Sequence, residues 1–61
     1  MKLYSITFYC KGTDAESNSE SMILWVKDEI KHPTNEFFLK ELFGVRYNEY
    51  EVIQIRKLKT E

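Results

Sequence analysis

Hydrophobic and polar residues alternate at the start of the chain. Between Lys2 and Cys10 the apolar residues occupy the even positions, namely Tyr4, Ile6, Phe8 and Cys10. A period of two is typical of a strand with one buried face, so the pattern predicts a strand over residues 2–10. The segment from Gly12 to Ser21 contains small and polar residues and no large apolar one, which predicts a flexible loop.

The continuous apolar run MILWVK, residues 22–27, fits two structures. As a helix it would begin with a capping box made by Ser17 and Glu20. As a strand it has a suitable length and β-favouring residues, and it accommodates Leu24, which the apolar arc of the helix leaves outside. We favour the strand, and the helical alternative stays open.

Pro33 marks a boundary after this run, because proline in a helix interior removes a hydrogen bond and clashes with the preceding turn. Thr34 is then a suitable N-cap, and Gly44 a suitable C-terminal stop. The pattern predicts a helix over Asn35–Phe43 whose apolar arc contains Phe38, Leu39, Leu42 and Phe43. Residues 45–49 connect this helix to a final predicted strand over Tyr50–Lys59.

The order strand, strand, helix, strand predicts an α+β fold. If the first two strands form a hairpin, a right-handed crossover through the helix places the third strand on the other side of the first. The sheet order is then two, one, three, in a mainly antiparallel three-stranded sheet. We expect the helix to cover one face, above Tyr4, Ile6 and Phe8, and the other face to stay open.

Length and composition favour a small binding domain over an enzyme. The 61 residues, 43% of them hydrophobic, predict one folded domain over residues 1–61. Its thin core leaves little room for an enclosed pocket with supporting residues, so we expect no enzymatic activity and no cofactor. The formal net charge of −1 argues against nucleic acid as the main partner.

The single cysteine, Cys10, excludes an internal disulfide, a cross-link that small secreted domains usually need. The first residues interleave Ser5 and Thr7 with apolar side chains and are followed by no small-residue cleavage site, so they predict neither a signal peptide nor a membrane span. We therefore expect a cytoplasmic protein without membrane contact, present as a monomer or weak dimer.

Three potential metal ligands, Asp28, His32 and Glu36, are spaced four residues apart, and one continuous helix would align them. Pro33 interrupts that helix, so we expect the three side chains to diverge and predict no metal site. Cys10 and His32 are a conceivable nucleophile and base. The sequence contains no nucleophile elbow, no glycine run whose N–H groups could stabilise an oxyanion, and no third residue to orient the base. We predict no catalytic residues, and we expect the scattered carboxylates to be solvated.

The order of elements, together with the local pattern MILWVKDEI followed by Thr34 and Phe37, resembles the Dmd antitoxin family of T4-like bacteriophages. The likeness covers the whole chain as architecture and Ser21–Phe37 as residues. It implies a phage protein that binds and inhibits a bacterial endoribonuclease toxin of the RnlA or LsoA type. Blocking such a toxin in the host cytoplasm would protect phage mRNA from degradation.

The resemblance also implies where the toxin is bound, since the family uses its helix and the approach to it to enter a cleft between toxin domains. The matching stretch here runs from residue 28 to residue 41, and the implied partner-binding residues are Asp28, Lys31, His32, Thr34, Phe37, Lys40 and Glu41. His32 stands where a large aromatic residue is expected, and Glu41 stands where an uncharged amide is expected. These two departures bear on which toxin the protein binds and on which contacts it makes with that toxin.

Other classes of function stay open on the sequence alone. Tyr9, Trp25 and Arg56 are expected on the open sheet face, where they could stack on single-stranded bases. A small phage single-stranded nucleic-acid-binding protein is therefore the alternative, and a minor structural or assembly protein is a third. The exposed edge strand MILWVK, with its aromatic residue, favours a protein interface.

Overall fold

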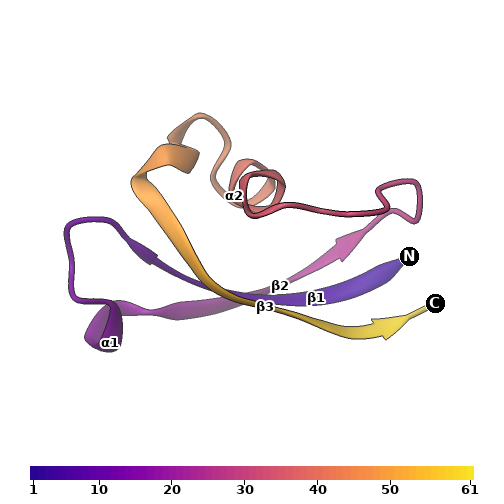
Figure 1. The fold of residues 1–61 in the computed structure, drawn as a ribbon, viewed down its shortest axis with the longest axis horizontal. Helices are drawn as coiled ribbons and strands as arrows, with labels where there is room; N and C mark the ends of the chain where they lie inside the picture. The colour runs from indigo at the N-terminus through magenta and orange to yellow at the C-terminus, as the bar shows by residue number, and fades with distance from the viewer.

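The computed structural model describes residues 1–61 as a single three-stranded sheet with helices at one face and one end (Figure 1). The elements in chain order are β1 (Lys2–Cys10), α1 (Ala15–Asn18), β2 (Glu20–Val26), α2 (Asn35–Phe43), the 3-10 helix η1 (Gly44–Glu49) and β3 (Tyr50–Thr60). Helix α2 and the turn η1 lie on one face of the sheet, whereas the opposite face has no covering element.

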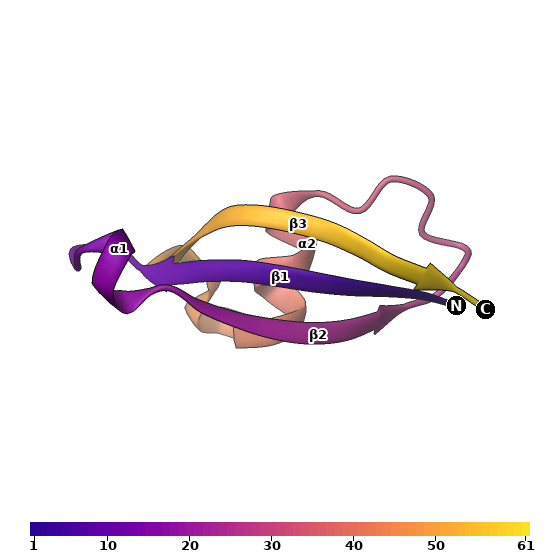
Figure 2. The same cartoon turned by 90° about the horizontal axis from the view of Figure 1, so that it is seen from below.

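The sheet has the order β2-β1-β3, and β1 pairs antiparallel with both neighbours. Figure 2 looks onto the open face and shows β1 between the two outer strands, with α2 behind the sheet. β2 and β3 therefore run in the same direction without touching, as a crossover connection through α2 requires. The predicted fold class and strand order are confirmed.

The two pairings of β1 differ in regularity. β1 and β2 pair in one unbroken register, from Lys2 opposite Val26 to Phe8 opposite Glu20. The register with β3 shifts twice, and each shift leaves one β3 residue without a partner, first Ile53 and then Leu58. Such bulges bend a strand and increase its twist, so β3 is the irregular edge of this sheet and β2 the regular one.

Helix α2 begins and ends where the sequence predicts. The backbone N–H of Phe37 donates to the Thr34 hydroxyl at 3.1 Å, which satisfies one of the free N–H groups of the first turn. At the other end Gly44 has φ 62° and ψ −129°, and its N–H donates to the carbonyl of Lys40. The cap and the glycine stop fix both ends of the helix.

The core lies between α2 and the sheet face that carries the even residues of β1. Its five buried side chains are Ile6, Phe8, Val26, Phe38 and Leu39. Tyr4 is half-buried, and its ring lies 5.1 Å from that of Phe38. The predicted burial of Ile6 and Phe8 beneath α2 is confirmed, whereas Tyr4 and Leu42 reach only partial burial at the rim.

One prediction for the N-terminal half needs correction, and one open alternative is resolved. The segment expected to be a loop contains the short helix α1, because the Asp14 carboxylate accepts a hydrogen bond from the N–H of Glu16 and caps a helical turn. The Ser17 hydroxyl donates to Asp14, and Glu20 is the first residue of β2, so the capping box that the helical alternative required does not form. The predicted strand over residues 22–27 is confirmed as β2, which begins earlier, at Glu20, and ends at Val26.

Candidate protein-binding surface

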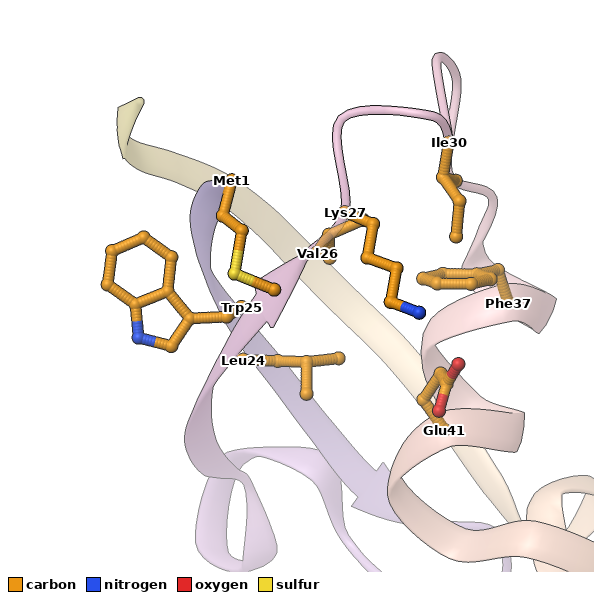
Figure 3. Close-up of a pocket in the computed structure, with 8 residues that line it drawn as sticks. All are labelled: Met1, Leu24, Trp25, Val26, Lys27, Ile30, Phe37 and Glu41. Carbon is orange, nitrogen blue, oxygen red and sulfur yellow. The ribbon is translucent and has the colours of Figure 1, made fainter. Parts of the chain in front are cut away.

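A groove runs between the outer strand β2 and helix α2, with a volume of about 420 Å³. We call it the β2–α2 groove; it is lined by Met1, Leu24, Trp25, Val26, Lys27, Ile30, Phe37 and Glu41. Figure 3 shows these side chains, which come from the end of β2, the loop after it and α2, together with Met1 at the start of the chain. Most of the lining is apolar, which is the character of a surface that recognises another apolar side chain.

The groove follows from the alternation of side chains along β2. Leu24 and Val26 point to the face that α2 covers, since their partners on β1 are Tyr4 and Lys2. After β2 a turn closed by the N–H of Ile30 and the carbonyl of Lys27, 3.1 Å apart, brings Ile30 back toward the helix. Strand, turn and helix thus supply three sides, and the side facing away from β1 is open.

Two charged side chains flank the apolar lining. Lys27 reaches from the end of β2 toward α2, and Glu41 projects from α2 at the other side (Figure 3). Neither side chain forms an ion pair within the chain. Both charges are exposed and therefore available to complementary groups on a partner.

The residues that the resemblance nominates do not form one patch. Phe37 and Glu41 line the β2–α2 groove. Asp28, Lys31 and His32 lie in the exposed connection between β2 and α2. A hydrogen bond from the amino group of Met1, at 3.0 Å, lowers the pKa of the Asp28 carboxyl below 3.8.

The other two nominated residues serve the helix itself. The Thr34 hydroxyl caps α2 and already accepts the N–H of Phe37. The Lys40 ammonium forms an ion pair with Glu36 at 2.8 Å and lies 5.0 Å from the centre of the Tyr47 ring. The bond to Glu36 raises the pKa of Lys40, and the residue borders a second hollow with Gly44, Val45 and Tyr47.

The three spaced candidate metal ligands do not share one helix. Asp28 and His32 lie in the connection after β2, and Glu36 lies in the first turn of α2. No group of three or more His, Cys, Asp or Glu side chains is arranged to hold a metal ion. Cys10 is the last residue of β1, and its Sγ donates to the carbonyl of Lys11 at 3.7 Å. The loop that contains His32 follows Val26, which pairs with Lys2 at the other end of β1. Cys10 and His32 therefore lie toward opposite ends of the sheet.

The open sheet face is a second exposed surface. It carries Trp25, Arg56 and Tyr9, as the sequence predicts. The odd residues of β1 point to this face; Tyr9 is one of them, and Trp25 and Arg56 each pair with another. The Lys59 ammonium lies 5.6 Å from the centre of the Trp25 ring across β1. Tyr9 lies at the far end and donates to Glu51 at 2.7 Å, a bond that raises the pKa of its hydroxyl.

Sequence reasoning identified β2 as an exposed edge but missed the groove beside it. The groove needs Ile30 and Phe37 to approach Leu24, and this approach depends on the turn after β2 and on the position of α2. One available signal was the spacing of Ile30 and Phe37 on either side of Pro33, which suggests apolar side chains on both flanks of a bend. The spacing alone does not place them against β2.

Comparisons of the chain with protein-family models, with curated proteins and with solved structures find no match. Neither of the two α-helices has the length and apolar character needed to cross a lipid bilayer. Fold and surface together describe a small α+β domain with two exposed surfaces, an apolar groove and an open sheet face. Its function is therefore inferred from those surfaces and from the sequence pattern.

Proposed function

We propose that this protein is a phage antitoxin that binds a bacterial endoribonuclease toxin of the RnlA or LsoA type and inhibits it by occupying its cleft. It performs no reaction; it protects phage mRNA by keeping the toxin inactive in the host cytoplasm. The observation that carries the proposal is the pattern MILWVKDEI with Thr34 and Phe37, in a chain whose elements have the order of the Dmd family.

A preformed binding surface supports this proposal. Helix α2 is capped by Thr34 at its start and stopped by Gly44 at its end, and its inner side is held by Phe38 in the core. An element that is already ordered loses little conformational entropy on binding, which favours affinity. The exposed side of α2 can therefore enter a cleft without refolding.

The charge on α2 also supports a toxin as partner. Glu36 and Glu41 are exposed on the helix, and only Glu36 is paired within the chain. An enzyme that cleaves RNA presents positive charge to its substrate, and an acidic helix is complementary to such a surface. Complementary charge speeds encounter more than it strengthens the final complex.

The test is co-purification of the tagged protein with toxins of the two types, read together with an RNA-cleavage assay. We expect a stable complex and loss of cleavage. Glu41→Lys should weaken inhibition, whereas Glu16→Lys, an identical change of charge on α1 at the other end of the molecule, should leave it unchanged. Absence of a complex with every toxin of this class would reject the proposal.

A second candidate function rests on the open sheet face. Trp25 is 40% exposed there, with Lys59 over its ring and Arg56 in the next row of the sheet, so a base could stack between cationic groups that contact phosphates. The fluorescence anisotropy of a dye-labelled single-stranded oligonucleotide measures this binding, and it can also be read in a variant that lacks Trp25, the single tryptophan. Binding that weakens steeply with salt and is abolished by Trp25→Ala, yet spared by Glu41→Lys, would favour this function over inhibition of a toxin.

A further inference from the structure

The two edges of the sheet differ in how they are protected from pairing with another strand. Edge strands are commonly guarded by charges, prolines or bulges. The β3 edge has two bulges and carries Arg56, Lys57 and Lys59. The β2 edge has an unbroken register, and its segment from residue 21 to residue 26 contains no charge, no proline and no glycine.

The unguarded segment also exposes large apolar side chains. Ile23 is 64% exposed, Met22 is 46% exposed and Trp25 is 40% exposed. Ile23 and Trp25 lie on the open face of the sheet, whereas Met22 lies on the face that α2 covers, since it pairs with the buried Ile6. Apolar residues thus extend along both faces of one free edge, which is the arrangement that a further strand would cover.

We propose that a second copy of this chain pairs its β2 with this edge, antiparallel and centred on Leu24, to form a continuous six-stranded sheet. In an antiparallel pair related by a two-fold axis, opposed residues share a face of the sheet. With Leu24 opposite Leu24 of the second copy, Ile23 faces Trp25 of that copy, and Met22 faces Val26. Pairs of an aromatic with a β-branched residue are among the favourable cross-strand contacts, and the two-fold axis makes this pair twice.

The β2–α2 groove gives this arrangement a fitted site for one side chain. Met22 of the second copy lies opposite Val26 and on the same face of the sheet as the groove, which is floored by Leu24, Ile30 and Phe37 (Figure 3). Methionine is unbranched and flexible, and it fills irregular apolar spaces well. By symmetry, Met22 of the first copy enters the groove of the second.

Charge favours a second copy of β2 over other strand pairings. An interface between identical edges places equal residues near the same axis, so a cationic edge repels itself and an uncharged edge does not. Pairing of β3 with β3 would bring Arg56, Lys57 and Lys59 of two copies together. A centre at Ile23 instead of Leu24 would set Glu20 against the buried Val26 and leave Trp25 opposite Ser21, which is a poorer apolar match. The centre at Leu24 instead pairs Trp25 with Ile23 and sets Glu20 against Asp28, which lies beyond the end of β2.

Sedimentation equilibrium over a range of concentrations tests the pairing, with two matched isoleucine variants. We expect the unmodified protein to form a dimer and Ile23→Lys to raise its dissociation constant by about tenfold or more, because a charge then lies on the paired edge. Ile53→Lys places the same change at a 51% exposed bulge of β3 and should leave the dissociation constant unchanged. Circular dichroism of each variant confirms that it is folded.

Cross-linking tests the register in a Cys10→Ser background. Opposed Cα atoms in an antiparallel pair are about 4.5–5.5 Å apart, which a disulfide spans, so Leu24→Cys should give a covalent dimer on mild oxidation. Ile23→Cys, whose opposed residue is Trp25, should give much less. A monomer at every concentration, a dimer that Ile53→Lys dissociates and Ile23→Lys does not, or preferential cross-linking through Ile23→Cys would overturn the proposal.

Discussion

The rings of Phe43 and Tyr50 are stacked, with centroids 3.7 Å apart and planes inclined by 6°. Phe43 is the last residue of α2, Tyr50 is the first residue of β3, and the whole of η1 lies between them. Phe8 from β1 meets both rings edge-on, at 4.9 Å and 6.0 Å. This aromatic cluster ties the end of the helix to the start of the last strand and to the centre of the sheet.

The stack of Phe43 on Tyr50 should contribute measurable coupling to stability. In a double-mutant cycle with Phe43→Leu and Tyr50→Leu, we expect a coupling energy of about 0.5–1.5 kcal/mol beyond the loss of buried area. The free energies of unfolding come from urea titrations of the four proteins. Strictly additive effects of the two substitutions would mean that the rings pack as ordinary apolar groups.

The hydroxyl group of Thr34 should stabilise α2 by capping its first turn. Thr34→Ala removes the acceptor of the Phe37 N–H and is expected to cost about 1 kcal/mol in urea unfolding. Thr34→Ser keeps an acceptor at the same position and should lose only a small part of that stability. Equal losses in the two variants would show that the methyl group, rather than the hydroxyl, is responsible.

Gly44 should be required for its backbone conformation alone. Its φ of 62° with ψ of −129° is a conformation that other L-residues rarely adopt, yet a Cβ there would meet no atom within 4 Å. Gly44→Ala should therefore destabilise the protein by about 1–3 kcal/mol. A synthetic chain with D-alanine at this position, which favours positive φ, should retain nearly full stability in thermal unfolding; a loss equal to that of L-alanine would contradict the explanation.

Glu49 should titrate at lower pH than an ordinary glutamate. Arg46 donates two hydrogen bonds to its carboxylate, at 3.0 and 3.1 Å, and these lower the pKa of Glu49 below 4.5. Because the folded-state pKa is the lower one, the pair stabilises the fold at pH values above about 4.5 and loses this effect as the pH falls through the folded value. The contribution is small, since both side chains are exposed.

NMR titration of the Glu49 side-chain carboxyl provides the measurement. Arg46→Leu should raise the pKa of Glu49 toward 4.5, and high salt should reduce the difference between the two proteins. Lys40→Leu removes a positive charge elsewhere on the molecule and should leave the Glu49 titration unchanged. An unaltered pKa in Arg46→Leu would exclude the proposed cause.

The parts of the fold that the sequence predicts well are those set by local chemistry. Period-two alternation located β1. Three residues located the ends of α2: Pro33 restricts the backbone before the helix, Thr34 caps its first turn, and Gly44 can adopt the positive φ at which the helix stops. Helix α1 was missed since a single Asp14 cap in a polar segment is indistinguishable from an ordinary turn residue. The bulges at Ile53 and Leu58 were missed since they depend on the pairing with β1.

For the candidate surface, the sequence predicts which residues are exposed but does not predict how they are arranged around the groove. An exposed β2 edge and an open face with Trp25 were expected, and both are present. The proximity of Phe37 to Leu24 depends on how α2 packs over the sheet, which no local pattern specifies. Lys40 and Glu41, adjacent in sequence, border different hollows because neighbouring helical residues point about 100° apart.

The bulges of β3 determine how far strand pairing can continue. An unprotected regular edge is a template for pairing with another chain, so a protein with two such edges can add copies at both ends and grow into a fibre. Here the β2 edge is the regular one, so joining two copies through it leaves only the bulged, lysine-bearing β3 strands at the outside. The same irregularity that bends β3 therefore makes the assembly finite and protects the chain from open-ended aggregation.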